Sequence, residues 1–403
     1  MNTAQLVYDI SSSYDAFGRL RMSDAYTIFD SKLLYNQQPF LWDEQAISGN
    51  GTSSYHSSNE AGVIMSVSSN VAGTLVRQTY QRFAYQPGKS QLVMMTGVLG
   101  SYSNGIIRRI GCFDSNNGLY FQSGPDDYYI VKRSYVTGTV VEDAVPQSKW
   151  NKNTLDTDDI ISFQPNNANI YYFNYEWLGV GDICCGVVIG KKFIQLHQFF
   201  HANEKTTVSF SKPNLPLRYE IQNTGTGEAA SLKCICSTVM SEGGHQNVGY
   251  IYTIDRGGTT VSVNSSGVLV PAITFRLIKG RESTNVFLEG VNIISTTTNV
   301  IFRWAVLLNP TFSTSITYTP VTSHSSVEYN NTTTSPTTVT EGLLIYSGYG
   351  IGTNATILTS TLAAKFSLGV SINGVSDVMC LAIQRLDNQN DNFYASVSIR
   401  ENS

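Results

Sequence analysis

Short apolar runs separated by turn residues make up most of the chain, and the spacing within them is that of β-strands. Two clear examples lie at 272–280 and 392–401. In both, every second residue is apolar: Ile273, Phe275 and Leu277 in the first, and Phe393, Ala395, Val397 and Ile399 in the second. Alternation with a period of two is typical of a strand with one buried face. Both segments are therefore predicted to be half-buried strands, the second paired into a sheet.

The turn residues between the runs fall where hairpins need them. Asn117-Gly118 stands between two apolar runs, and this dipeptide is a strong short-range hairpin signal. Pro87 and Gly88, in "QPGKS", have the order of a tight turn. The run that follows, "QLVMMTGVLG" (91–100), is apolar enough to predict a strand covered on both faces.

The runs divide the chain into three parts. The leader, 1–50, ends in a region rich in Gly, Ser and Asn, which is typical of a boundary. Residues 51–245 hold about ten short strands at a spacing typical of a β-sandwich. In 246–403 Thr, Ser, Val and Ile dominate and charge becomes sparse. The predicted fold class is all-β, with an extended N-terminal arm, a β-sandwich and a second, C-terminal antiparallel β-domain.

The charge and hydropathy of the chain exclude some classes of function. Of the 403 residues 14% are charged, against roughly 25% in an average domain. A net charge of −4 offers no basic face for nucleic acid. The sequence has no apolar run of about 18 residues, so no membrane insertion is expected. The start "MNTAQLVYDI" lacks the features of a secretory signal, which predicts synthesis into a cytosol.

Six cysteines are too few for a disulfide framework in a chain of this size. All six are predicted to behave as small, mostly buried apolar residues. Cys184 and Cys185 are adjacent, so strand geometry would point them to opposite faces. Cys234 and Cys236 are two residues apart, which predicts that they share one face at a separation of about 6.6 Å.

Carboxylates matter because β-sandwiches of this size include glycosidases. Glu176 and Asp182 flank "WLGVG" and are the candidate pair. Retaining glycosidases need carboxyl groups about 5 to 5.5 Å apart. A Gly-rich turn separates these two, and the Glu-x-Asp-x-x-Glu pattern of jelly-roll glucanases is absent. No catalytic residue is predicted, and a polysaccharide hydrolase is the least supported alternative.

The candidate metal and phosphate motifs are weak. His197 and His201 lie in a segment with strand periodicity, which would place them on one face with Phe193, Gln195 and Phe199. Four residues along a strand span about 13 Å, too far for one zinc ion with bonds near 2.0 to 2.1 Å. The sequence also lacks a Gly-rich loop followed by Lys-Ser/Thr. No metal or cofactor is predicted.

Aromatic residues concentrate in the middle domain. They are Tyr128, Tyr129, Tyr135, Tyr171, Tyr172, Tyr175 and Trp177. Exposed, such side chains could stack on sugars; buried, they would fill a core or a subunit interface. Packing is the favoured interpretation, with carbohydrate binding as the alternative.

The leader segment "DAFGRLRMSDAYTIFDSKLLY" (15–35) mixes apolar and charged residues without a period. A segment this short cannot bury enough apolar surface to order itself. Its apolar side chains are nevertheless too many to leave in water. It is therefore predicted to pack against a neighbouring chain or along the outside of its own sandwich, rather than in a core.

Several blocks resemble a family of tailed-phage virion structural proteins that is frequent in marine and cyanobacterial phages. The resemblance covers roughly residues 15–255. It rests on "AFGRLRMSDAYTIFDSK", "QPFLWDEQ", "RQTYQRFAYQPGKSQLVMMTGVLG", "NGLYFQSG", "YFNYEWLGVGDICCGVVIG", "FHAN", "PNLPLRYEI" and "MSEGG". The middle domain also resembles a concanavalin or laminin-G type jelly roll.

The resemblance implies a non-enzymatic virion component, in head decoration or in the tail or baseplate, made in the host cytoplasm. The expected partners are further copies of the chain, with a trimer preferred, and other virion proteins. The alternative function is a carbohydrate-binding fibre or adhesin protein that recognises host-surface glycans. The assembly interface is predicted to comprise Phe17, Arg19, Leu20, Arg21, Tyr26, Ile28, Phe29, Phe40 and Trp42.

Overall fold

The computed structural model describes residues 24–156, 162–179, 181–353, 356–358, 367–388 and 390–402. Within these ranges the chain is almost entirely β, and its single helical element is the short 3₁₀ turn η2 (Gln147–Lys149). No helix in the described part of the chain is long and apolar enough to span a membrane. The predicted all-β class is confirmed.

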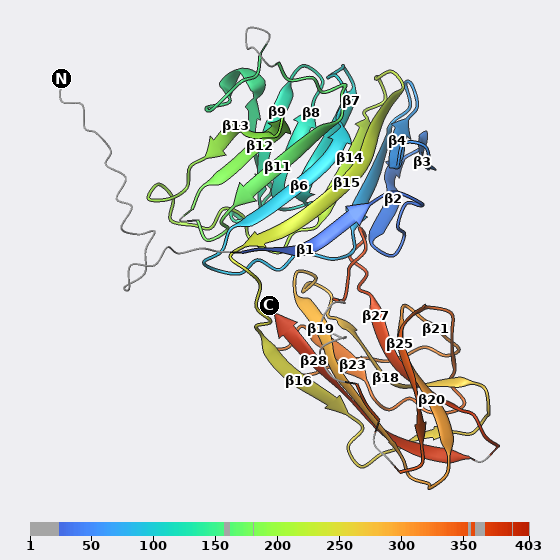
Figure 1. The fold of residues 1–403 in the computed structure, drawn as a ribbon. Coiled ribbons are helices and arrows are strands. Elements are labelled where there is room, and N and C mark those ends of the chain that lie inside the picture. Colours follow the sequence, from blue (N-terminus) through green and yellow to red (C-terminus); the bar gives the residue numbers. More distant parts are fainter. Residues whose placement is uncertain are drawn as a thin grey trace.

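Two antiparallel sheets form the first domain (Figure 1). The eight-stranded sheet has the order β13-β12-β11-β6-β15-β4-β3, with β1 also paired to β15. Its strands are β1 (Ala25–Lys32), β3 (Thr52–Ser57), β4 (Gly62–Val67), β6 (Gln91–Val98), β11 (Asn169–Tyr175), β12 (Ile183–Ile189), β13 (Lys192–Phe199) and β15 (Ala230–Glu242). The seven-stranded sheet has the order β10-β9-β8-β7-β14-β5-β2. Its strands are β2 (Trp42–Gly49), β5 (Gly73–Thr79), β7 (Ile106–Phe113), β8 (Gly118–Ser123), β9 (Tyr128–Ser134), β10 (Val141–Pro146) and β14 (Leu217–Asn223).

The second domain is also a sandwich of two antiparallel sheets, with a two-stranded ribbon on its outside. One sheet contains β16 (Tyr250–Asp255), β17 (Val261–Val263), β19 (Asn285–Ser295), β26 (Thr356–Leu358) and β28 (Asp391–Asn402). The other contains β18 (Leu269–Leu277), β20 (Ile301–Leu308), β22 (Thr319–Pro320), β23 (Val327–Asn330), β25 (Leu343–Ile351) and β27 (Val378–Arg385). The ribbon pairs β21 (Thr311–Phe312) with β24 (Val339–Thr340).

Each domain has its own hydrophobic core. The first core draws its side chains from Phe29 to Val239, and the second from Ile254 to Ile399. The alternation seen in the sequence is present in β28, where Phe393 is fully buried and its neighbour Tyr394 is 41% exposed. The Asn117-Gly118 hairpin joins β7 to β8, with Phe113 opposite Gly118. These local predictions are confirmed.

The prediction for 91–100 is wrong in one respect. Strand β6 is not covered on both faces, because Met94, Thr96 and Val98 are partly exposed while the residues between them are buried. Its apolar outer side chains lie on the open face of the eight-stranded sheet. Sequence pattern could not separate this arrangement from a fully covered strand, since both consist of apolar runs.

The described part of the leader corrects the predicted arm. Strand β1 pairs with β15 and strand β2 with β5, so each extends one sheet of the first sandwich. Phe29, Leu33 and Trp42 belong to its hydrophobic core. The expectation that this segment lies outside a core is therefore wrong for residues 25–49. Two short strands can be buried here because partners distant in sequence supply the rest of each sheet.

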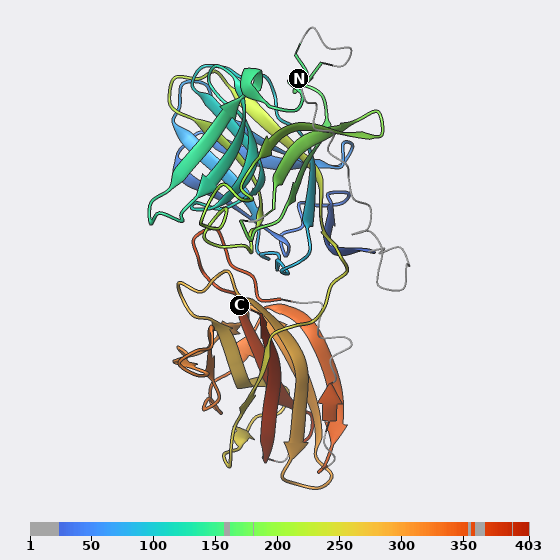
Figure 2. The same ribbon diagram turned by 90° about the vertical axis from the view of Figure 1, so that its left-hand side faces the viewer.

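The two domains meet end to end, as both ribbon views show (Figures 1 and 2). The loop 367–377 of the second domain reaches the first, where Ile372 N donates to Asp43 Oδ2 at 2.7 Å and Val370 N donates to Tyr80 O at 2.8 Å. On the other side of the junction, Asn214 Nδ2 donates to Ser283 O at 2.7 Å. Hydrogen bonds from several segments thus hold the junction.

Candidate functional site

A groove runs along the outer face of the eight-stranded sheet. It has a volume of about 380 Å³. Its lining residues come from four neighbouring strands: Thr27, Asp30, Ser31, Lys32, Met94, Thr96, Ile170, Cys236, Ser237 and Thr238. Pockets of about 300 to 1,000 Å³ with a mostly apolar lining and a few placed polar groups are typical of small-molecule sites.

The floor of the groove is a row of side chains that cross-strand pairing holds side by side. Ile170 lies opposite Thr96, Thr96 opposite Cys236, and Cys236 opposite Lys32. Cys236 Sγ lies 3.2 Å from Thr96 Oγ1. The floor therefore combines methyl and thiol groups with hydroxyls, supplied by rigid strands rather than by loops.

A β-bulge creates this floor, and it corrects the prediction for the cysteine pair. The register of β15 against β6 shifts between Cys234 and Cys236. Cys234 consequently lies in the core while Cys236 lies in the groove, instead of both sharing one face. An extra residue in one strand reverses the alternation beyond it. The six cysteines are free and either buried or partly buried, as predicted.

An aromatic pair extends the groove across the next strands. Tyr172 lies opposite Met94 on the groove side and opposite Gly186 on the other. A Cβ at Gly186 would lie 2.6 Å from the Tyr172 ring, so glycine is required for that ring to lie across β12. The ring of Phe193 packs edge-on against Tyr172 at 5.0 Å and is 56% exposed. The exposed ring of Phe193 thus lies beside the groove, held by the buried ring of Tyr172.

The groove is close to electrically neutral. Its one carboxylate, Asp30, pairs with Lys32 at 3.1 Å, and both side chains are more than half exposed. Glycosidases need two carboxyl groups, so the lining does not supply such a pair. No cluster of three or more metal-ligating side chains occurs among the described residues. The groove suits an uncharged ligand that offers hydroxyls and an apolar face.

The predicted assembly residues are not brought together as one surface. Phe17, Arg19, Leu20 and Arg21 lie outside the described residues. Tyr26 stacks on His245 at 5.2 Å, and Ile28 is half-buried. Phe40 is 60% exposed, whereas Phe29 and Trp42 are 7% and 3% exposed. The prediction of an interface role is wrong for Phe29 and Trp42, because their side chains fill their own domain's core.

The other candidates from the sequence have structural partners. Asp182 accepts a hydrogen bond from Gln198, and the Glu176 side chain packs against Gly181. His197 lies opposite Cys185 in β13, and His201 Nε2 contacts Thr207 O at 2.5 Å. The faces of β13 differ from the prediction: a bulge opposite Cys185 and Gly186 makes both Leu196 and His197 buried.

Most of the aromatic cluster is buried, as favoured. Tyr128, Tyr171 and Tyr175 lie in the core, Tyr172 is covered on the outer face of the sheet by Phe193, and Tyr135 is 39% exposed. Burial raises the pKa of the Tyr171 and Tyr175 hydroxyls well above their ordinary range. These groups therefore stay neutral and serve packing.

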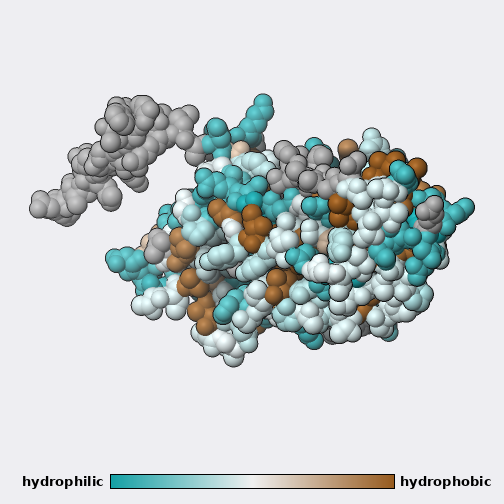
Figure 3. Space-filling model, turned by 90° about the horizontal axis from the view of Figure 1, so that it is seen from below, coloured by the Kyte–Doolittle hydropathy of each residue, from teal (hydrophilic) through white to brown (hydrophobic). Residues whose placement is uncertain are grey.

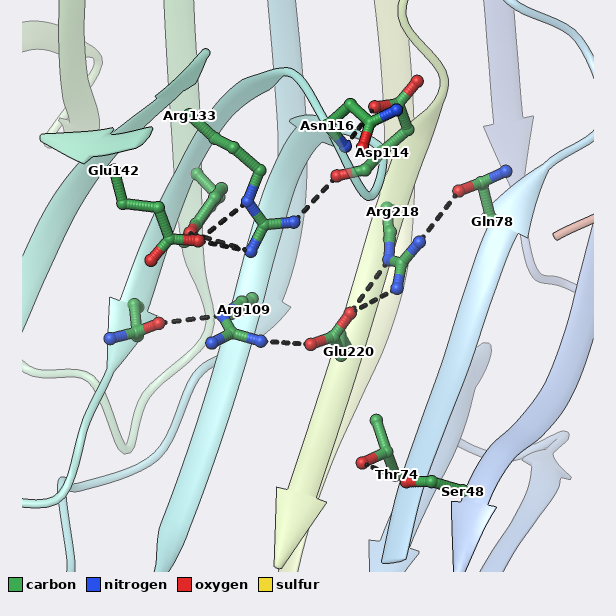
Figure 4. A network of polar contacts seen from close by, with 12 residues as sticks. Ser48, Thr74, Gln78, Arg109, Asp114, Asn116, Arg133, Glu142, Arg218 and Glu220 are labelled. Carbon is green, nitrogen blue, oxygen red and sulfur yellow. Dashed lines mark hydrogen bonds and ion pairs between the residues drawn. The ribbon is translucent and has the colours of Figure 1, made fainter. Parts of the chain in front are cut away.

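A charged network on the outer face of the seven-stranded sheet was not predicted from the sequence. Glu220 accepts hydrogen bonds from Arg218 Nε at 2.9 Å and from Arg109, and Figure 4 shows both guanidinium groups pointing to it. Burial alone would raise the pKa of Glu220, but the two guanidinium groups hold it below its ordinary value. Arg133 bonds Glu142 at 2.8 Å in the same network. Only strand register brings these residues together.

Comparisons with known proteins found solved structures that resemble this chain at low similarity. Neither the family models nor the curated proteins gave a match. Among solved structures, the legume lectin-like domain from Entamoeba histolytica is 7% identical, covering 53% of this chain and 96% of that chain, with a TM-score of 0.31. The CBM2 module of the evolved Dit of Lactobacillus casei BL23 phage J-1 is 7% identical, covering 56% and 100%, with a TM-score of 0.35. The carbohydrate recognition domain of Emp47p is 13% identical, covering 55% and 97%, with a TM-score of 0.34. Similarity at this level carries no inference about function.

Proposed function

We propose that this chain is a non-enzymatic structural protein of a tailed-phage virion, in head decoration or in the tail or baseplate. The support begins with the sequence blocks that resemble that family of virion proteins. In this role the two sandwiches act as rigid modules, and the chain assembles with further copies and other virion proteins.

The observation that carries the proposal is that the resembling blocks contact one another in the first domain. Tyr85, from the "QRFAYQPGKS" block, stacks on Tyr175 of the "YFNYEWLGVG" block at 6.5 Å. Tyr85 N also donates to Asn214 of "PNLPLRYEI" at 2.9 Å. Phe29 of the leader block packs against Phe83 at 5.0 Å. The sequence blocks that carry the resemblance therefore belong to one folded domain, in which they contact one another.

One face of the second domain agrees with a protein that is stable as a free subunit. Seen from below, its apolar side chains form separate small areas among hydrophilic ones (Figure 3). Single exposed apolar side chains are normal on soluble proteins, whereas large continuous patches mark permanent interfaces. We therefore expect the assembly contacts to lie on surfaces other than this face of the second domain.

Mass spectrometry of purified particles tests the proposal. We expect peptides of this chain in particles that have been freed of host protein. Several hundred copies per particle would indicate head decoration, and a few to a few dozen would indicate the tail or baseplate. Absence of the chain from intact particles would refute the proposal.

Carbohydrate binding in the groove is a second candidate function. A neutral cavity with hydroxyls and a methyl-rich floor, with the exposed ring of Phe193 beside it, matches the chemistry of an uncharged sugar, which has hydroxyls at its edge and C–H groups on its face. Tyr and Phe side chains supply such contact area.

A Phe193→Ala variant tests this candidate on a glycan array and by calorimetry with the best glycan. Because burying a phenyl ring is worth roughly 1.5 to 3 kcal/mol, we expect binding to weaken at least about tenfold. Phe200→Ala is the matched control, since Phe200 is 46% exposed and follows the same strand, whereas Phe193 packs against Tyr172 beside the groove. Equal glycan binding by both variants would exclude Phe193 from the site.

A further inference from the structure

A second cavity on the same sheet face lies at the end of the first domain opposite the junction. It has a volume of about 450 Å³. Its lining joins β4, β6, β7 and β15 to the turn before β4 and to the loops after β6 and before β11: Glu60, Ile64, Val98, Gly100, Ser101, Tyr102, Ser103, Arg108, Asn166, Ser231 and Lys233. Lys233 lies near the start of β15, whereas the linker to the second domain follows the end of that strand.

Arg108 is a buried cation in this lining, and its hydrogen-bond acceptors among the described residues are neutral backbone carbonyl groups. It is 7% exposed, and its Nε and Nη1 atoms donate to Ser231 O and Ser101 O, each at 2.8 Å. No ion pair between described residues includes it. Burial lowers the pKa of Arg108 from its ordinary value. A buried charge without a counter-ion is costly, so such groups are usually paired or bind an ion.

Backbone geometry holds this guanidinium at the cavity. Gly100 has a φ of +82°, and a Cβ there would lie 3.1 Å from the Arg108 guanidinium carbon. Glycine adopts this φ without strain and leaves room for the guanidinium beside the loop. The second cation of the lining, Lys233, pairs with Glu60 at 3.0 Å. The lining thus holds two cations and one carboxylate.

Arg256, a buried arginine of the second domain, serves as a comparison for Arg108. Its Nη1 donates to Ala272 O and Thr333 O, and its Nη2 to Thr260 O. Both terminal nitrogens are thus engaged by carbonyl groups. Arg108, in contrast, donates to described residues from Nε and from one terminal nitrogen, Nη1, and lies in the wall of a cavity.

We propose that this cavity binds an acidic saccharide, with its carboxylate or sulfate group beside Arg108 and Lys233. Arg is well suited to oxyanions because its planar fork donates two parallel hydrogen bonds. Three serine residues and Asn166 supply partners for sugar hydroxyls, and Tyr102, 47% exposed, offers a ring face. This proposal does not depend on the virion role. It gives the first domain a charged binding site in addition to the neutral groove.

Ligand-observed NMR and calorimetry on the full chain test the ligand class. The probes are methyl glucuronide, glucose 6-sulfate, methyl glucoside and inorganic sulfate. We expect at least one acidic sugar to bind ten or more times tighter than methyl glucoside. Its affinity should fall with added salt, because the Debye length shortens from about 10 Å at 0.1 M to about 3 Å at 1 M. Equal affinity for acidic and neutral sugars would overturn the proposal. Inorganic sulfate binding as tightly as the sulfated sugar would reduce the site to an anion site and overturn the saccharide assignment.

Three variants locate the ligand. Arg108→Gln should lose binding. Because Arg108 also holds the backbone carbonyls of Ser101 and Ser231, this variant could disturb the fold, so Lys233→Gln and Tyr102→Ala are made as well. Each of these two should weaken binding about tenfold without moving the thermal transition. Lys191→Gln is the charge-matched control, because Lys191 is exposed on the β12–β13 turn. Binding that survives all three cavity variants but is lost in Phe193→Ala would place the ligand in the groove and refute this site.

Discussion

Replacing Trp42 by alanine should lower the free energy of unfolding of the first domain by about 3 to 5 kcal/mol, the usual range for a buried tryptophan. The Trp42 side chain is 3% exposed, packs against Phe29 and Tyr219, and donates from Nε1 to Ser31 Oγ at 2.9 Å. It therefore links both leader strands to the sandwich core. Calorimetry should show the transition lowered by about 2 to 4 °C for each kcal/mol lost.

Phe40→Ala is the matched control for this prediction. Phe40 lies two residues before Trp42 but is 60% exposed, so its loss should change stability by no more than about 0.5 kcal/mol. Similar small effects of both substitutions would mean that the leader packs outside the core, as the sequence predicted, and would contradict the position of Trp42 found here.

Glu220→Gln should be the most destabilising single change on the outer face of the seven-stranded sheet. The variant leaves the Arg109 and Arg218 guanidinium groups without their carboxylate, and the Arg218 side chain is only 8% exposed. Removing one partner of a buried ion pair costs about 3 to 5 kcal/mol. Urea unfolding followed by circular dichroism measures the loss, with Glu204→Gln in an exposed loop as the control.

The same carboxylate makes stability depend on pH. The folded-state pKa of Glu220 lies below its ordinary value of 4.5. Its contribution is therefore complete above pH 4.5 and is lost as pH falls through the lowered folded-state pKa. The difference in unfolding free energy between the native chain and Glu220→Gln should shrink in that range. A difference that stays constant down to pH 2 would show that Glu220 does not act through its charge.

The pattern of apolar positions was enough to predict strands and turns. Period-two alternation identified β18 and β28, and Asn117-Gly118 identified the hairpin between β7 and β8. Adjacent thiols pointed to opposite faces as expected, with Cys185 in the core and Cys184 partly exposed. These features depend on a few neighbouring residues and on backbone geometry that is the same in every strand, so a sequence can reveal them.

Pairing between distant strands decided the rest. The leader joins the core because β15 and β5 lie beside β1 and β2, across more than 200 residues in the first case. Bulges at Cys234/Cys236 and in β13 moved side chains between faces, because one unpaired residue reverses all those after it. The groove, the Glu220 network and the cavity beside Arg108 follow from such register. By itself the sequence determined strands, turns and an all-β class, whereas only the tertiary structure decided which side chains share a surface, since that depends on which strands are neighbours and in what register.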